Sequence, residues 1–298
     1  MKQRTRNALA GLLFISPWII GFLVFTLYPL LETLRYSVSK VRIQTTGVTT
    51  EFIGLVNFKQ VLLQDPDFMV QVPGYLQQIF LLVPMSIVFS VLLSILLNQS
   101  LAGRRFFRAV FFLPVILMCG PLLTNILELD ATTLEGVREF VIYKFIDDYF
   151  PQLLAAPLLY IFDNIILILW FCGVQILIFL SGLQKIDRSV YAAAMVDGAS
   201  AWQQFWKITL PTLKPFILLN AIYAIVDVSS SSLNTVTKVI KDGMFAAAKG
   251  FGFSAAAGYI YFLFILIFIL CVYLLLGHGE YRERKALKNP KRRVPTGR

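Results

Sequence analysis

The segment Tyr191–Pro215, YAAAMVDGASAWQQFWKITLPTLKP, decides how this chain is interpreted. It is polar, it is interrupted by a glycine, and it lies between two long apolar runs. Residues 189–196 contain no helix breaker, and Gly198 permits the left-handed turn that ends a helix. Residues 199–208 form a second amphipathic pattern, and Pro211 is expected to end it. The sequence therefore predicts two short helices that meet at Gly198, and we call residues 191–211 the elbow.

The elbow stands among blocks of about 20 apolar residues, the length that a helix needs to cross a bilayer. The chain is 57% hydrophobic and only 15% charged. Its apolar runs are continuous rather than alternating, and lipid tolerates only a backbone that is hydrogen-bonded internally. The sequence predicts an all-α integral membrane protein, a single domain over residues 1–298. Six membrane-spanning helices are expected at 8–31, 76–97, 106–127, 158–180, 215–233 and 253–276.

The distribution of basic residues predicts the orientation of these helices. The net charge is +10, and most of the 27 Lys and Arg residues fall in alternate connections and in the C-terminal tail. This asymmetry follows the positive-inside rule if both termini and the loop 181–214 are cytoplasmic. The basic excess is thus a topology signal and does not point to nucleic acid. The first apolar run is too long for a cleaved signal and has no A-x-A site, so we expect a retained helix.

The sequence contains no motif for metal binding, ATP binding or hydrolytic catalysis among those considered below. The three cysteines lie in predicted helices, and His278 is the single histidine, so no metal-ligand spacing occurs. There is no G-x-x-x-x-G-K-[ST] to hold ATP, and neither H-E-x-x-H nor G-x-S-x-G is present. We therefore expect no catalytic, cofactor or metal site, and a membrane-embedded enzyme is the disfavoured alternative.

The elbow resembles the coupling loop, or EAA motif, of permease subunits of binding-protein-dependent ABC importers. Ala193, Ala194, Gly198, Ile208, Leu210 and Pro211 fall in register with that motif, and Asp197-Gly198-Ala199 matches its sugar-type form. Ala192 stands where the family usually has Glu. The resemblance implies that the elbow docks on an ATPase through its small residues, with an aromatic face anchoring it to the membrane helices. The implied coupling residues are Tyr191, Ala192, Ala193, Ala194, Met195, Asp197, Gly198, Ile208, Leu210 and Pro211.

The resemblance covers most of the chain. The stretches Gly11–Ser37, Gly54–Phe68, Arg104–Leu117 and Leu177–Ala194 look like those of maltose-type permeases, and Ala257–Phe268 is similar to permeases for oligosaccharides or polysaccharide fragments. It implies a type I importer permease fold and one half of an alternating-access pore for a sugar. The implied partners are a second permease chain, two ATPase chains that bind ATP and Mg²⁺, and an extracellular binding protein, in the bacterial cytoplasmic membrane. A permease for a non-sugar solute is the alternative.

Polar residues in the fifth predicted helix suggest a pathway. Asn220, Tyr223, Asp227, Ser231 and Asn234 would lie within a stripe roughly 80° wide and about 21 Å long on a continuous helix. A carboxylate in a bilayer usually faces a cavity or a partner, and hydroxyls, amides and a tyrosine suit a sugar. Hydrogen bonding between packed helices explains the same residues equally well. Asn164 and Gln175 could line the same cavity, whereas Ser86, Ser90 and Ser94 indicate a close-packed seam.

Overall fold

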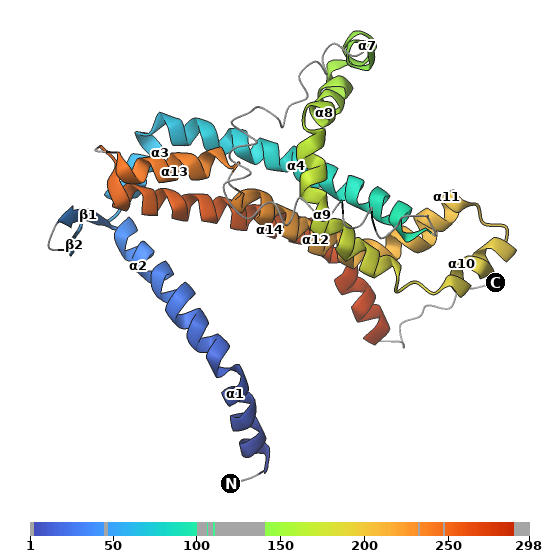
Figure 1. Cartoon of the computed structure of the whole chain (residues 1–298), viewed down its shortest axis with the longest axis horizontal. Coiled ribbons are helices and arrows are strands. Elements are labelled where there is room, and N and C mark those ends of the chain that lie inside the picture. The colour runs from blue at the N-terminus through green and yellow to red at the C-terminus, as the bar shows by residue number, and fades with distance from the viewer. Residues whose placement is uncertain are drawn as a thin grey trace. The chain divides into compact units, whose positions relative to one another are not determined.

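A computed structural model describes residues 3–44, 47–99, 106, 110, 141–231, 233–246 and 248–288. These residues are almost entirely helical, with one two-stranded sheet (Figure 1). The chain divides into two compact units. One comprises Met1–Tyr75 and Thr235–Phe264, and the other comprises Leu76–Asn234 and Ile265–Arg298.

The first unit begins with a long helical rod formed by α1 (Gln3–Phe22), the π turn η1 (Leu23–Leu27) and α2 (Tyr28–Ser37) (Figure 1). The predicted span 8–31 lies inside this rod, which starts earlier and ends later. The N–H of Tyr28 bonds to the carbonyl of Leu23, five residues back, directly before Pro29. Such a widened turn relieves the clash that a proline ring makes with the preceding helical turn.

A β-hairpin follows this rod, and it corrects the expectation of an all-α chain. Strands β1 (Ser39–Gln44) and β2 (Gly47–Phe52) pair antiparallel, with Ser39 opposite Phe52 and Gln44 opposite Gly47. Both strands contain β-branched residues that alternate or cluster, which favours extended backbone. The sequence did not predict these strands, because each is only six residues long and stands out little beside the long apolar runs.

The next two helices meet at an acidic cap. The short helix α3 (Val56–Leu63) lies within the stretch 54–68, and α4 (Pro66–Asn98) begins well before the predicted start of its span at 76. Asp65 caps α4 by accepting a hydrogen bond of 2.8 Å from the backbone N–H of Phe68. The buried Asp65 carboxylate also forms an ion pair with Lys249, which connects α4 to the segment before α14.

Backbone packing around Gly252 closes the first unit. The helices α13 (Thr235–Phe245) and α14 (Gly250–Lys288) complete this part of the chain, and the predicted span 253–276 lies inside α14. The side-chain amide of the buried Asn57 donates hydrogen bonds of 2.9 Å to the carbonyls of both Ser37 and Ser39. A Cβ on Gly252 would lie 2.3 Å from the Ser39 carbonyl oxygen, so only glycine fits there.

The second unit packs a bundle of helices around a small core. Its elements after α4 are α7 (Val141–Tyr149), α8 (Gln152–Asp163), α9 (Ile165–Leu183), α10 (Arg188–Val196), α11 (Ala201–Gln204), the π turn η3 (Phe205–Thr209) and α12 (Leu210–Ser230). Val91, Phe179, Leu183 and Leu213 form the core cluster that joins α4, α9 and α12. The closeness of α9 and α12 depends on Gly182, where a Cβ would lie 2.9 Å from the Phe216 ring.

A ladder of polar side chains joins α4 to α9 inside this unit. Ser86, Ser90 and Gln175 are all fully buried. The Gln175 amide nitrogen donates to the Ser86 hydroxyl at 3.2 Å, and the Ser90 hydroxyl donates to the Gln175 carbonyl oxygen at 3.2 Å. The seam that the serine spacing predicted is therefore present, and its partner is a side chain from another helix.

The described residues contain four helical stretches that are long and apolar enough to cross a membrane. These are Ala10–Ser37, Pro66–Asn98, Ala201–Phe245 and Gly250–Gly277, and a pair bent by 65°, Leu167–Leu183 with Arg188–Val196, would make a fifth. The predicted span 158–180 is interrupted, because α8 ends at Asp163 and α9 begins at Ile165. The predicted span 215–233 ends at Ser230, and the predicted span 106–127 lies outside the described residues apart from positions 106 and 110.

Candidate functional site

The first arm of the elbow is built on α10, which begins as the sequence predicted. Asp187 is the N-cap, and its carboxylate accepts a hydrogen bond of 2.9 Å from the backbone N–H of Ser189. This bond holds the pKa of the Asp187 carboxyl below its ordinary value, because it stabilises the charged form. The negative charge also suits the N-terminal end of a helix.

Gly198 turns the chain at the point that the sequence indicated. Its φ is +79°, in the left-handed region that favours glycine. The N–H of Gly198 bonds to the Met195 carbonyl at 3.1 Å, and the N–H of Ala199 bonds to the Ala194 carbonyl at 2.9 Å. This pair of bonds is a Schellman motif, which satisfies the last carbonyls of α10 and fixes the direction of the second arm.

The second arm starts from a capping box and has no break at Pro211. Ser200 and Gln203 exchange hydrogen bonds between their side chains and backbone N–H groups, at 2.9 and 3.3 Å. The expected end at Pro211 is wrong, because α11 continues through η3 into α12. The reason is again a π turn, in which the N–H of Leu210 bonds to the Phe205 carbonyl and makes room for the proline.

One contact closes the elbow on itself, and a second ties it to the helical bundle. The hydroxyls of Tyr191 on α10 and Thr209 on η3 share a hydrogen bond of 2.8 Å, which closes the elbow across its two arms. Phe205 packs on the core cluster of α4, α9 and α12. The elbow is therefore closed across its two arms and anchored to these helices.

The expected aromatic anchor is only partly correct. Phe205 is half-buried and contacts the core, as predicted. Trp202 and Trp206 pack edge to face with ring centroids 5.5 Å apart, but both are exposed, Trp202 by 69%. Their apolar surface is thus turned away from the bundle.

The tip of the elbow presents a free apolar surface. Ala192 and Ala193 are exposed, and so are Met195 and Val196, the latter by 88%. A short helix that shows small and apolar side chains suits insertion into the groove of a partner. Other residues that the resemblance implied for coupling frame this tip. Asp197 is exposed next to Gly198, while Ile208 and Leu210 are half-buried on the second arm.

The polar stripe expected along the fifth predicted helix is shorter than the sequence suggested. Asn220, Tyr223 and Asp227 do lie on α12, whereas the helix ends at Ser230. Ser231 adopts an extended backbone conformation, and its hydroxyl accepts from the N–H of Leu233 at 3.1 Å. Asn234 is buried and donates to the Ser229 carbonyl at 2.6 Å. The last two positions therefore form the turn after α12 rather than a helical face.

Asn220 is the most unusual member of the shortened stripe. It is fully buried, and neither its amide nitrogen nor its carbonyl oxygen has a hydrogen-bond partner in the part of the chain that the structure describes. An unpaired buried amide is costly, so such groups call for an explanation in each structure. Tyr223 and Asp227, half-buried, follow on the same helical face.

The two residues proposed from the fourth predicted helix lie in different environments. Asn164 occupies the break between α8 and α9, where its side-chain amide donates to the Tyr160 carbonyl at 3.0 Å. Gln175 belongs to the polar ladder with Ser86 and Ser90. Neither contact joins these two residues to Asn220, and their role in a pathway stays a prediction.

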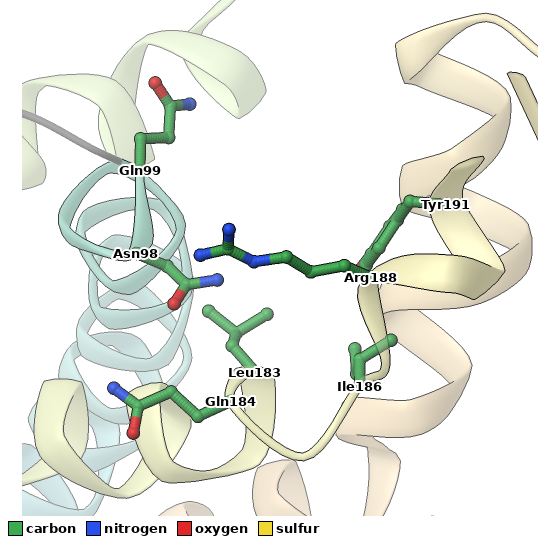
Figure 2. Close-up of a pocket in the computed structure, with 7 residues that line it drawn as sticks. All are labelled: Asn98, Gln99, Leu183, Gln184, Ile186, Arg188 and Tyr191. Carbon is green, nitrogen blue, oxygen red and sulfur yellow. The ribbon is translucent and has the colours of Figure 1, made fainter.

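A cavity of about 590 Å³ lies behind the elbow. Figure 2 shows Arg188 of α10 extending across it toward Asn98 at the end of α4, with Gln99 and Gln184 around it. Tyr191 lines this cavity and also a second one of about 390 Å³ beside it. Asn98, Gln99 and Leu183 line both cavities as well, so the two form neighbouring parts of one recess.

Several residues of this site were missed from the sequence. The Ser200–Gln203 capping box carries a recognisable S-x-x-Q pattern that could have been read. Thr209 and the recess residues Asn98, Gln99, Gln184 and Arg188 come from separate elements, so no local pattern brings them together.

Comparison with known proteins gives a consistent set of relatives. No protein-family model matches the chain. It is 33% identical over 217 residues to "Probable ABC transporter permease protein YesP" of Bacillus subtilis, covering 73% of this chain and 69% of the relative. It is 29% identical over 226 residues to "Multiple sugar-binding transport system permease protein MsmF" of Streptococcus mutans, covering 75% of each chain. It is 27% identical over 300 residues to "Lactose transport system permease protein LacF" of Rhizobium radiobacter, covering 92% of this chain and 95% of the relative.

The fold has a solved counterpart. A chain in the crystal structure of a bacterial alginate ABC transporter, in complex with an alginate pentasaccharide-bound periplasmic protein, superposes with a TM-score of 0.63. The match covers 92% of this chain and 96% of that chain at 19% identity, so it supports the fold.

Proposed function

Because the chain belongs to the permease family of ABC transporters, we propose that it forms half of the translocation pore of an ATP-driven importer for a sugar or oligosaccharide. The substrate class follows from relatives named for multiple sugars, lactose and arabinooligosaccharides. The observation that carries the proposal is the elbow, a closed and anchored turn with an exposed apolar tip, on a chain of this family. The chain is a transport subunit and not an enzyme, and a separate ATPase hydrolyses ATP.

The proposed topology has six spans, with both termini and the elbow in the cytoplasm of a bacterial cell. The described helices support four of these spans, or five if the bent pair counts as one, and the apolar run 106–127 is proposed as the sixth from its sequence alone. The excess of Lys and Arg in the connections assigned to the cytoplasm supports the orientation. This arrangement places the elbow on the side where ATP is available.

The proposed assembly contains a second permease chain, two ATPase chains carrying ATP and Mg²⁺, and an extracellular binding protein. The alginate transporter was crystallised with an alginate pentasaccharide-bound periplasmic protein, which supports the last of these. The rod of α1, η1 and α2 supports the first. In the most apolar part of its span Ala10–Ser37, no residue is buried. This leaves a long apolar surface for lipid and a second chain.

In the proposed mechanism, the elbow transmits the ATPase movement. Closure of the ATPases displaces Met195 and Val196 at the tip. The Tyr191–Thr209 bond and the Phe205 contact carry this displacement to α12, α9 and α4. The pore then changes between outward-facing and inward-facing states, whose populations are biased by the nucleotide.

The assembly is tested by purifying the tagged chain from its native membrane in mild detergent. We expect a second permease, an ATPase and an extracellular binding protein to be recovered with it, and ATP hydrolysis to increase when the binding protein and its sugar are added. Recovery of the chain without any ATPase, under conditions in which a related importer stays intact, would contradict the proposal.

The pathway is proposed to include Asn220, Tyr223 and Asp227. The unpaired Asn220 amide supports this, since a sugar hydroxyl would satisfy both of its polar atoms. Replacing Asp227 with Ala is expected to reduce sugar uptake into proteoliposomes about tenfold or more, because a hydrogen bond to a charged group is lost. Asp242→Ala, at an exposed position of α13, is the matched control and should transport normally. Unchanged uptake and sugar preference in Asp227→Ala would assign the residue to helix packing.

A further inference from the structure

The recess behind the elbow has the size of a ligand site. Its larger part measures about 590 Å³, within the range of about 300–1,000 Å³ that small-molecule sites occupy. It is bounded by the ends of α4 and α9 and by the start of α10 (Figure 2). All of these elements belong to the second unit, so the recess is formed within one compact part of the chain.

Hydrogen-bonding groups in the recess are available to a ligand. The side chains of Asn98, Gln99, Gln184 and Arg188 make no hydrogen bond or ion pair within the described residues. Three carboxamides offer both donors and acceptors, and the guanidinium offers donors only. The Tyr191 ring adds an aromatic surface, while its hydroxyl is held by Thr209. The apolar contribution comes from Leu183 and Ile186.

Among the described residues, the charges around the recess nearly cancel. Arg188 is the one charged side chain among its described lining residues. The C-termini of α4 and α9 end at the same place, and each carries a partial charge of about −0.5. The Asp187 carboxylate is occupied by the backbone of its own helix. Because one guanidinium roughly balances two helix ends, an anion gains little here, and a neutral ligand rich in hydroxyls fits best.

We propose that this recess binds a neutral sugar at the cytoplasmic face and that the bound sugar restrains the elbow. The inference rests on the proposed function, because the recess then faces the compartment into which the sugar is delivered. It is separate from the polar stripe on α12, since none of its described lining residues belongs to that helix.

The restraint follows from which elements the ligand would join. Asn98 and Gln99 stand at the end of α4, whereas Arg188 and Tyr191 stand on α10, the first arm of the elbow. A sugar bonded to both sets cross-links the arm to the bundle in its present position. Accumulated sugar therefore slows the elbow movement and with it ATP hydrolysis, as a form of feedback by the imported product.

Binding is tested on the purified complex in nanodiscs by protection of a cysteine. Gln99→Cys places a thiol in the recess, and Lys207→Cys places one at an exposed position outside it. Both are labelled with a polar thiol reagent, and the parent chain corrects for its own cysteines. Glucose, lactose, maltose and trehalose are titrated as neutral probes, and inorganic phosphate as the anionic probe.

We expect a neutral probe at about ten times its Kd to slow labelling of Gln99→Cys about tenfold, because only the empty fraction reacts. Labelling of Lys207→Cys should not change. Adding Arg188→Gln to Gln99→Cys should raise the Kd about tenfold, with labelling of Lys207→Cys as evidence that the fold is kept. Labelling of Gln99→Cys that no neutral sugar slows, or that phosphate slows instead, overturns the proposal.

The restraint is tested by ATP hydrolysis in the same complex. The protecting sugar, added at the cytoplasmic face at about the parent's Kd, should lower the stimulated rate clearly in the parent chain and only slightly in Arg188→Gln, whose Kd is about tenfold higher. Protection without any change in this rate overturns the restraint. The labelling result needs no transport activity, so failure of the proposed function would appear separately, as a complex that lacks an ATPase or stimulation by a binding protein.

Discussion

Replacing Gly198 with Pro is expected to abolish sugar uptake while the permease still assembles in the membrane. A proline requires φ near −65°, whereas this position has a φ of +79°. It also removes the N–H that bonds to the Met195 carbonyl. Both changes break the turn that joins α10 to α11, so tip displacement no longer reaches α12. We expect uptake into proteoliposomes to fall by roughly a hundredfold or more, with ATP hydrolysis no longer stimulated by the binding protein, because losses of about 1–3 kcal/mol from backbone strain and of a further hydrogen bond combine.

Gly198→Asn is the matched control, because Asn tolerates the left-handed conformation better than other side chains. It should retain most of the uptake. Equal uptake by the Pro variant and the parent chain would show that the turn has no part in coupling. If the Pro variant does not reach the membrane, uptake is measured on Gly198→Val instead. Valine keeps the backbone N–H, so only the unfavourable φ disturbs the turn.

Replacing Gly252 with Ala is expected to destabilise the first unit strongly. The added Cβ would lie 2.3 Å from the Ser39 carbonyl oxygen and 2.8 Å from the Asn57 side-chain nitrogen. A backbone carbonyl cannot swing away as a flexible side chain can, so the hairpin and α3 must shift and the two Asn57 bonds weaken. Overpacking of this kind costs about 1–3 kcal/mol. We expect a lower thermal unfolding temperature for the detergent-purified chain and a smaller folded fraction at growth temperature.

Gly74→Ala provides the comparison for this variant. Gly74 lies within α4 in the same unit, and a Cβ there meets nothing within 4 Å. Alanine favours a helix over glycine by up to about 1 kcal/mol, so this variant should be as stable as the parent chain or more so. An unfolding temperature of Gly252→Ala equal to that of Gly74→Ala would show that the contact around Ser39 relaxes without loss.

The elbow was predictable because its determinants are local. The turn at Gly198 and the helix before it depend on residues within one segment. A glycine that follows a helical pattern commonly marks the end of the helix, so the turn could be predicted. The apolar blocks were recognisable for a similar reason, since length and composition alone decide whether a helix can cross a membrane. The structure supports this at the level of four or five spans.

The predictions were wrong where a local sequence rule assumed a backbone conformation that the chain does not adopt. Pro211 was interpreted as a helix end, but the π turn at Phe205–Thr209 admits the proline, and no residue pattern announces a π turn. The stripe on α12 assumed a helix beyond Ser230, where the turn held by Ser231 and Asn234 ends it. The recess behind the elbow gathers residues from α4, α9 and α10, so only the fold could reveal it.

The polar ladder between α4 and α9 has a consequence for how this sequence can diverge. Gln175 bonds to Ser86 and Ser90 across two helices, and all three are sealed from solvent. Losing one member strands the others in an apolar interior, whereas removing all of them for well-shaped apolar side chains can be nearly neutral. Descendants of this chain should therefore carry the three polar residues together or have lost them together, so that mixed combinations are rare among its lineages.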